Sequence, residues 1–265
     1  MPGVLSYRYL FSQLVRRELR QKYKGSALGV LWYLVNPVVL MAAYWFMFGV
    51  VLTPPRAIPD FPVYLMVGIL VWTFFQQSLL SAAPSLIDQS GLVRKARFPR
   101  EAIPAATVTV QLVIFTAVLA ILLPIAVAIR GTLTPALLLL PVLMALLFCF
   151  VLGCSVIAAI LHAYFRDVEP ILTAALLPWF FITPIFLVLQ GPNEVSFVRT
   201  HPWTGIVLNW INPIAPFINA FRSVLFYGTA PEWGYLVYGV AAAAVALVVG
   251  KVVFQRMQGE LAVVL

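Results

Sequence analysis

Residues that could carry out acid–base, nucleophilic or metal chemistry are few in this chain and lie far from one another. All nine acidic residues fall between long apolar runs or at their ends: Glu18, Asp60, Asp88, Glu101, Asp167, Glu169, Glu194, Glu232 and Glu260. General acid–base catalysis and ion coupling inside a membrane both need an ionisable side chain at the depth of the site. The distribution therefore argues against an intramembrane hydrolase, a glycosyl transferase and an ion- or proton-coupled transporter.

The histidines and cysteines suggest no reactive site either. His162 and His201 are expected at opposite faces of a membrane, so we interpret each as a capping or interface residue. Cys149 and Cys154 share one apolar run without a neighbouring His or Asp, which favours packing over metal binding or a disulfide. The G-x-x-x-x-G-K-S/T loop that binds nucleotide phosphates does not occur. We predict no catalytic residue, no metal site and no cofactor in this chain.

Long runs without Asp, Glu, Lys or Arg predict an all-α integral membrane protein with one domain, residues 1–265. The first four runs exceed the roughly 20 apolar residues that a helix needs to cross a bilayer, where the backbone must satisfy its own hydrogen bonds. Six spans are predicted, at 28–52, 62–87, 102–129, 135–164, 170–190 and 233–254. Prolines and asparagines interrupt the uncharged stretch within 196–222, so we predict a re-entrant or interfacial element there rather than a seventh span.

The basic residues predict the orientation of the chain. Alternate loops place thirteen of the seventeen Lys and Arg on one side, which the positive-inside rule identifies as cytoplasmic. These are Arg8, Arg16, Arg17, Arg20, Lys22, Lys24, Arg94, Lys95, Arg97, Arg100, Arg166, Lys251 and Arg256. Both termini are then cytoplasmic. Topology and anionic lipid explain the net charge of +8 without nucleic acid as a partner.

Two of the cytoplasmic segments have patterns of their own. Residues 4–22 place apolar side chains on one half of a helical wheel and predict an amphipathic helix at the membrane interface, although Arg8 and Glu18 interrupt its apolar face. This helix is either a surface anchor or a docking element for a cytoplasmic partner. Residues 88–101 combine basic residues with an apolar pair, and Pro99 is expected to end a short helix there.

Aromatic residues also lie within the predicted spans, away from the interfaces where aromatic residues are common. They include Trp45, Phe48, Trp72, Phe75, Trp179 and Phe181. Their rings could line a path along which a sugar chain slides. The alternative, and the more common role of such rings, is packing against lipid or neighbouring helices.

Several segments, in this order and spacing, resemble the membrane (permease) subunit of type-2 ABC exporters for polysaccharides, the O-antigen and teichoic acid export group. They are R-E-L-R-Q-K-Y-K-G-S-A-L-G-V-L-W at 17–32, N-P at 36–37, L-V-R-K-A-R-F-P-R-E at 92–101, F-R-D-V-E-P at 165–170, F-I-T-P-I at 181–185 and N-P-I-A-P-F-I-N-A-F-R at 212–222. Together they extend over nearly the whole chain. Their order carries the resemblance, because none of them would be specific alone.

The resemblance implies a homodimer of six-span subunits that works with two copies of a cytoplasmic ABC ATPase, which would bind ATP and Mg²⁺. It implies export of a polyprenyl-diphosphate-linked glycan across the bacterial cytoplasmic (inner) membrane. The path would be a channel at the dimer interface, with the 196–222 segment capping its exit. Many relatives carry Glu at the position of Asn219, so no charge-dependent role is transferred there.

Site residues follow from the same resemblance. A coupling helix within 88–101 would contact the ATPase, and the turn at 165–170 would make a second, smaller contact. The predicted contact residues are Leu92, Val93, Arg94, Lys95, Arg97, Phe98, Glu101, Arg166 and Asp167. A basic cluster would attract the diphosphate at the cytoplasmic entrance, although positive-inside topology explains the same residues without a ligand. This cluster consists of Arg16, Arg17, Arg20, Lys22 and Lys24.

Two other functions remain open. One is a type-2 ABC exporter of small hydrophobic molecules or drugs, which would share the fold and the ATPase partner but need no polymer-wide channel. The other is a membrane scaffold without transport activity. For a scaffold, no ATPase would be encoded beside the chain, and changes at Arg97 or Phe98 would alter no activity.

Overall fold

Helices form all the regular structure in the part of the chain that the computed structural model describes, which is residues 4–23, 32, 35, 38–40, 42–43, 46–51, 60–93, 99–131, 133–187, 196–259 and 261. The longer helices are α1 (Val4–Tyr23), α3 (Phe61–Ala82), α6 (Ala102–Arg130), α7 (Leu140–Tyr164), α8 (Val168–Ile182), α11 (Ala215–Leu225) and α12 (Trp233–Met257). The short elements are the π-helices η1 (Phe46–Val51) and η3 (Val207–Ile211), the 3-10 helix η2 (Pro135–Leu139), and α4 (Ser85–Asp88), α5 (Ser90–Val93), α9 (Ser196–Thr200) and α10 (Pro202–Ile206). The predicted all-α class is confirmed for these residues.

Four segments are long and apolar enough to cross a membrane: Phe61–Ala82, Ala102–Arg130, Pro135–Tyr164 and Trp233–Met257. They coincide with four of the six predicted spans. The predicted span at 62–87 is divided in the structure, because α3 ends just before Pro84 and α4 begins just after it. The predicted span at 28–52 lies largely outside the described residues and stays a prediction.

Helix α8 is shorter than the predicted span at 170–190. Its 15 residues extend over roughly 22 Å at 1.5 Å per residue, less than the ~30 Å of a bilayer's hydrocarbon core. Pro184 explains where the helix ends, because the residue before a proline is driven out of the helical conformation. Thr183 accordingly adopts φ −73° and ψ 134°, and α8 stops at Ile182.

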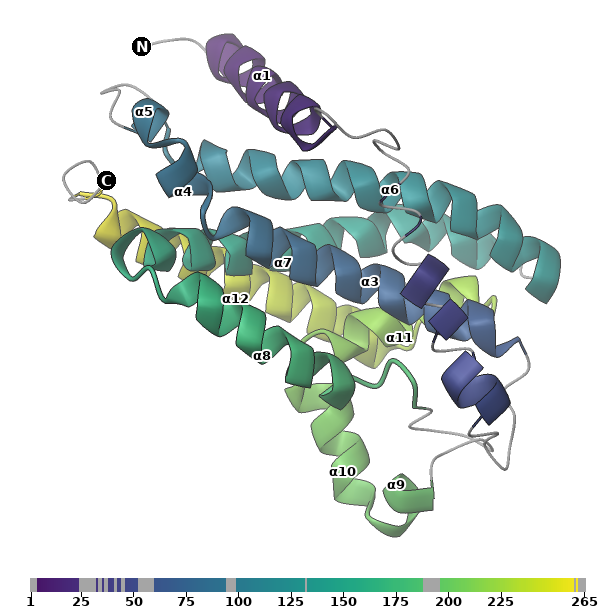
Figure 1. Ribbon diagram of the computed structural model, residues 1–265. Coiled ribbons are helices and arrows are strands. Elements are labelled where there is room, and N and C mark those ends of the chain that lie inside the picture. Colours follow the sequence, from purple (N-terminus) through teal and green to yellow (C-terminus); the bar gives the residue numbers. More distant parts are fainter. Residues whose placement is uncertain are drawn as a thin grey trace.

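The tightest packing in the bundle joins α7 to α12. Gly153 faces the backbone of Ala246, and Gly250 faces the backbone of Gly153. Small residues at such positions let two helices approach closely, which is a common way of packing helices in membranes. Helix α3 lies inside the bundle, in contact with α6, α7, α8 and α11, and most of its side chains are buried. Helices α9 and α10 extend away from the bundle (Figure 1).

Segments that are distant in the sequence meet at one end of the bundle, which we call the Val93 end. The Tyr164 hydroxyl donates a hydrogen bond to the carbonyl of Met257, and Arg100 donates one to the carbonyl of Gln258. An apolar cluster at this end contains Leu86, Val93, Ile103, Ala159, Phe254 and Leu261. Helices α4 and α5 and the last turn of α12 therefore lie together there, as Figure 1 shows.

The opposite end, which we call the Arg130 end, is held by polar contacts. Arg130 Nη1 lies 2.7 Å from Asp60 Oδ2 in an ion pair, and Arg130 Nε donates to the Phe226 carbonyl at 3.2 Å. The Thr134 hydroxyl donates to the Gly228 carbonyl at 2.8 Å. The predicted alternation of loops requires these segments to lie apart from 88–101 and 165–169, and in the structure they lie apart from the described residues 88–93, 99–101 and 165–169. Which end faces the cytoplasm stays a prediction.

The outer surfaces of two of the candidate spans are apolar. Helix α6 exposes Ile121, Ile125 and Ile129, and α12 exposes Val237 and Val248. Apolar surface of this extent is unusual in a soluble monomer and is typical of a face that contacts lipid or another membrane chain. The chain is therefore a multi-pass membrane protein.

Candidate functional site

An elbow at the Val93 end precedes the predicted ATPase contact. Pro84 separates α3 from α4, and the Ser85 hydroxyl donates to the Ala82 carbonyl at 2.6 Å, which holds the bend. Val93 is fully buried in the apolar cluster of this end. Its side chain anchors the elbow, and the predicted contact of Val93 with an ATPase stays a prediction.

The other predicted contacts of this segment have different positions. Leu92 and Glu101 are partly exposed, so part of each side chain is accessible to a partner. Arg94, Lys95, Arg97 and Phe98 lie outside the described residues. Their proposed contact with an ATPase therefore rests on the sequence pattern and on the position of the elbow that leads into them.

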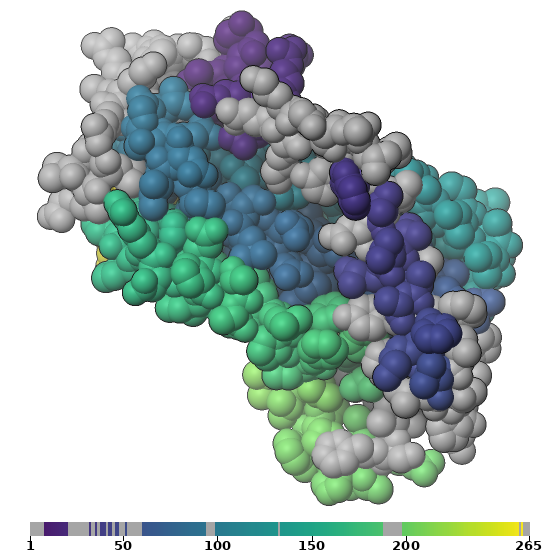
Figure 2. Space-filling model, viewed as in Figure 1, coloured from purple at the N-terminus to yellow at the C-terminus, as the bar shows by residue number. Residues whose placement is uncertain are grey.

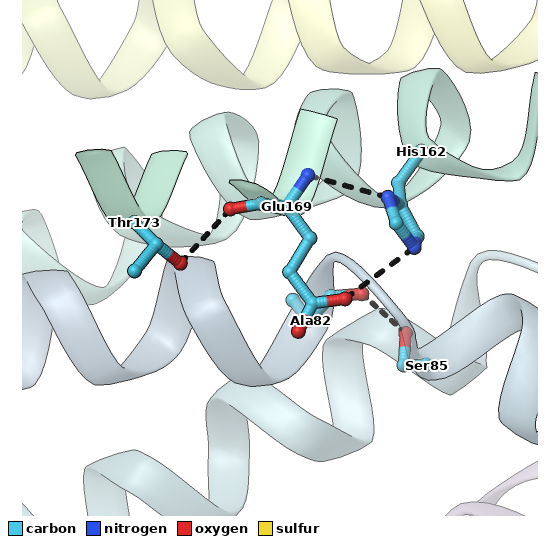
Figure 3. A network of polar contacts seen from close by, with 5 residues as sticks. All are labelled: Ala82, Ser85, His162, Glu169 and Thr173. Atoms are coloured by element: carbon cyan, nitrogen blue, oxygen red, sulfur yellow. Dashed lines mark hydrogen bonds and ion pairs between the residues drawn. The ribbon is translucent and has the colours of Figure 1, made fainter. Parts of the chain in front are cut away.

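The turn between α7 and α8 exposes its central residues. Phe165, Arg166 and Asp167 are all exposed, as a contact with a partner protein requires. Next to this turn, the Glu169 backbone N–H donates to His162 Nδ1 at 3.3 Å, and the Glu169 carboxylate lies 3.6 Å from His162 Nε2 (Figure 3). Because Nδ1 accepts a hydrogen bond, the proton of the neutral imidazole sits on Nε2, toward the carboxylate.

We call this pair the His162–Glu169 clasp. It joins the last turn of α7 to the first turn of α8, and the Thr173 hydroxyl extends it by donating to the Glu169 carbonyl at 2.9 Å (Figure 3). Of the two roles expected for His162, capping or interface, the structure shows capping, because the ring accepts a backbone N–H in the first turn of α8. His201 precedes α10, far along the chain, and its Nδ1 lies 3.0 Å from the Thr200 hydroxyl.

Helix α1 lies beside α6 and has the predicted amphipathic pattern (Figure 1). Leu14 is buried, whereas Arg16, Arg17 and Arg20 are exposed. The side chain of Lys22 and all of Lys24 lie outside the described residues. Glu18, which interrupts the apolar face, has a polar partner: its carboxylate accepts a hydrogen bond from Gln89 Nε2, at the junction of α4 and α5.

The predicted channel-lining aromatics separate into two groups. Trp72 and Phe75 are 2% and 1% exposed, and both rings contact Trp179, at centroid distances of 6.1 and 5.4 Å. These two therefore lie in the core of the subunit and line no surface of it. Phe181 is 54% exposed on α8 and is available to line a path. Trp45 and the side chain of Phe48 lie outside the described residues.

A buried arginine at the Arg130 end was not predicted. Arg222 on α11 is 1% exposed. Its Nη1 donates to the Pro184 carbonyl at 2.8 Å and its Nη2 to the Ile185 carbonyl at 2.6 Å. Its guanidinium carbon lies 3.6 Å from the ring centroid of Tyr64, whose hydroxyl donates to the Leu187 carbonyl at 2.9 Å. We call these contacts the Arg222 clamp.

The predicted re-entrant segment contains α9, α10, η3 and α11, so it is helical with a break near Asn212. The break is polar. Asn212 accepts a hydrogen bond from Trp179 Nε1 at 3.1 Å and donates one to the Thr183 hydroxyl at 2.9 Å. Asn219 Nδ2 donates to Asn209 Oδ1 at 2.7 Å across the two helical arms. Whether the segment enters the membrane stays a prediction.

Neither the contacts at the Val93 end nor those at the Arg130 end resemble a reactive centre. In the part of the chain that the structure describes, no three His, Cys, Asp or Glu residues are grouped so that they could hold a metal ion. The arrangement is suited to binding a partner at exposed turns and to transmitting movement along helices.

Comparisons with known proteins agree with this description. A family model described as "ABC-2 type transporter" matches residues 9–226. An O-antigen export system permease protein RfbA from Myxococcus xanthus is 30% identical over 256 residues, which cover 97% of this chain and 95% of the relative. Two proteins of the same name from Klebsiella pneumoniae are 27% and 26% identical over 264 residues, covering 97% of this chain and 96% of each relative.

Proposed function

The chain belongs to the ABC-2 type transporter family, and from this premise we propose that it is the membrane subunit of an ATP-driven exporter of a lipid-linked polysaccharide, of the O-antigen or teichoic acid type. The relatives named as O-antigen export permeases match it almost from end to end. Two copies of the chain would form the channel, each with six spans and cytoplasmic termini. The chain would lie in the bacterial cytoplasmic membrane.

The observation that carries the proposal is the grouping at the Val93 end. The elbow that leads into residues 94–98, the exposed turn between α7 and α8, and the last turn of α12 all lie there. Two separate contact segments at one end of a helix bundle suit a single cytoplasmic partner. We propose that this partner is an ABC ATPase, present in two copies, which binds ATP and Mg²⁺ and supplies the energy for export.

The proposed mechanism is conformational and involves no covalent chemistry in this chain. ATP binding would draw the two ATPases together, and their movement would reach the bundle through the segment at 94–98 and through Arg166 and Asp167. The exposed guanidinium groups of Arg16, Arg17 and Arg20 would attract the diphosphate of the substrate, because arginine binds phosphate through paired hydrogen bonds. Among the predicted channel-lining aromatics whose side chains are described, Phe181 is the most exposed and is our candidate for the channel wall.

The proposal is tested by co-expressing the chain with the ABC ATPase encoded beside it and purifying the membrane complex. We expect a stable assembly of two membrane and two ATPase subunits whose ATP hydrolysis is stimulated by lipid-linked glycan. The double change Arg97→Glu with Phe98→Ala should abolish the stimulation, because it reverses a charge and removes a ring at the proposed contact. Arg256→Glu on α12, which alters an exposed charge of the same end, is the control.

The outcomes separate the possible functions. Stimulation by hydrophobic drugs and not by glycan would indicate an exporter of small molecules instead. If the chain captures no ATPase, or if the double change leaves hydrolysis and export as in the wild type, the coupling that we propose is wrong.

A further inference from the structure

Helix α8 lies at the edge of the bundle and is packed on one face only. That face contacts α3 and α7 through Leu172, Leu176 and Trp179, and the rest of the helix exposes Ile171, Leu177 and Phe181. Figure 2 shows α8, in green, on the face in view. A helix that is packed on one face only can shift as a unit more easily than one enclosed by the bundle. Its end contacts then determine what else moves with it.

At the Val93 end, the His162–Glu169 clasp holds the first turn of α8 beside the exposed turn at 165–167. A push on Arg166 or Asp167 would therefore act directly on α8. At the other end, the chain leaves the helix at Thr183 and continues in non-helical conformation. The carbonyls of this segment have lost their helical partners and need donors from elsewhere.

The Arg222 clamp supplies those donors. The two terminal nitrogens of one guanidinium hold the successive carbonyls of Pro184 and Ile185, and Tyr64 holds that of Leu187. The planar fork of arginine suits two acceptors at a fixed spacing, which a single-point donor matches less well. Among the described residues no carboxylate pairs with Arg222, so the carbonyls are its principal partners.

The site is shaped to hold the guanidinium. Gly68 on α3 leaves the space, since a Cβ at that position would lie 2.9 Å from Arg222 Nη2. A buried cation without a counter-ion is costly, and so is a buried carbonyl without a donor. The guanidinium has its acceptors, and the carbonyls have their donors, only while Arg222 and the segment after α8 stay in contact.

A second link joins the same two parts. Asn212, which lies just before α11, bonds to Trp179 in the last turn of α8 and to Thr183 beside it. The outer end of α8 is thus attached to the start of α11 through Asn212 and to its later turns through Arg222. A shift of α8 along its axis would carry α11 with it.

We infer that Arg222 is a positioning residue for export, which transmits the displacement of α8 to α11 and so links the ATPase-facing turn to the segment at the channel exit. This inference rests on the proposed function. Without the clamp, the ATPase would still bind at the Val93 end and hydrolyse ATP, but α11 would no longer follow α8. Export per ATP hydrolysed is therefore the quantity that Arg222 controls.

The test uses the complex of this chain with its neighbouring ATPase, in cells and after purification. Arg222→Met removes the donors and replaces the buried charge with an apolar side chain, which a core tolerates better than an unpaired polar group. Tyr64→Phe removes one hydroxyl and leaves the ring. Arg130→Met is the matched control. Arg130 lies at the same end, donates to the Phe226 carbonyl and to the Asp60 carboxylate, and lies over the Phe226 ring. These contacts do not involve residues 183–187.

We expect Arg222→Met to assemble and hydrolyse ATP at close to the wild-type rate while surface glycan per ATP falls about tenfold, the size of a typical coupling between two sites. Tyr64→Phe should lower the amount of surface glycan per ATP by a smaller factor, and Arg130→Met should leave this amount as in the wild type. Arg222→Lys should recover part of the loss, because an ammonium group can still donate to carbonyls.

Three results would overturn the inference: proportional losses of hydrolysis and export in Arg222→Met with Tyr64→Phe unchanged, equal uncoupling by Arg222→Met and Arg130→Met, or an unchanged ratio in Arg222→Met. Each of these leaves the proposed function intact, because the wild type still exports glycan. If the wild-type complex moves no glycan to the surface, the proposed function itself fails, and the two failures are distinguished.

Discussion

At Gly153, the absence of a side chain is what allows α7 and α12 to touch. A Cβ built at this position would overlap the carbonyl group of Ala246 and lie 2.7 Å from the nitrogen of Leu247. These are backbone atoms, which cannot move aside as the tip of a flexible side chain can. The residue therefore determines the distance between the two helices, and any larger side chain must push them apart.

Gly153→Ala should destabilise the protein by about 1–3 kcal/mol, the usual cost of overpacking a well-packed core. The measurement is thermal unfolding of the purified chain in detergent. Gly239→Ala on α12 is the matched control, because its Cβ would meet Phe217 and Leu146 at 3.5 and 3.6 Å, which is ordinary contact. Equal melting temperatures for the two variants would show that α7 and α12 are not in such close contact.

Single residues were the hardest level to predict. Trp72 and Phe75 lie on a mostly apolar helix, and hydropathy alone does not distinguish a ring that packs in the core from one that lines a path. Val93 precedes a run of basic residues, and the sequence does not show that its side chain belongs to the core. The sequence does not show the partner of Glu18 either, because Gln89 is distant in the sequence. Contacts between segments decide all of these cases.

Helices were predictable where length and charge mark both ends. The prediction of 102–129 corresponds to α6 (Ala102–Arg130), because Glu101 and Arg130 border an uninterrupted apolar run. Helix α8 differs, since no charge marks the break after Ile182, and only Pro184 signals it. A proline within an apolar run can thus indicate the end of a helix that hydropathy does not show. Arg222 was a similar signal, because a lone arginine on the apolar helix α11 needs partners.

At the start of α8, the His162–Glu169 clasp yields a prediction about local stability. His162→Phe keeps a ring of similar size but leaves the Glu169 N–H without its acceptor. Losing a buried hydrogen-bond partner costs about 1–3 kcal/mol, so amide exchange in the first turn of α8 should accelerate about tenfold or more. Hydrogen–deuterium exchange of peptides that include 165–173 measures this.

His201→Phe is the control for that experiment. His201 is exposed and contacts Thr200 at the other end of the bundle, so its replacement should leave exchange in α8 unchanged. Unchanged exchange at the start of α8 in His162→Phe would mean that the clasp does not hold the turn. In that case the exposed turn would be connected to α8 by the backbone alone.

For the whole molecule, the charge asymmetry predicted which loops share a side, and the structure brings them together at two ends. The Arg100 contact with Gln258 and the Arg130 contact with Phe226 each join loops that the alternation of spans had grouped. The loops could be grouped because each span places the next loop on the opposite side of the membrane. The charge pattern could not predict which helices pack together, since the apolar runs have similar compositions and any of them could neighbour any other.

Labelling of introduced cysteines tests the orientation. In a chain with Cys149 and Cys154 replaced by Ala, we expect Tyr227→Cys to react with an impermeant maleimide in intact spheroplasts, because Tyr227 is exposed beside the Arg130 end. Arg166→Cys should react only after the membrane is opened. The chain without cysteines should not react at all. The reverse labelling pattern would place the Val93 end outside and overturn the proposed contact with a cytoplasmic ATPase.

The contact between α7 and α12 also governs how the protein is made. The glycine face of α7 is complete only when Ala246 and Gly250 lie against it, and these residues belong to α12, which is translated well after α7. A chain cut short before Trp233 would lack the surface against which α7 packs, so α7 can reach its final packing only after α12 has been made.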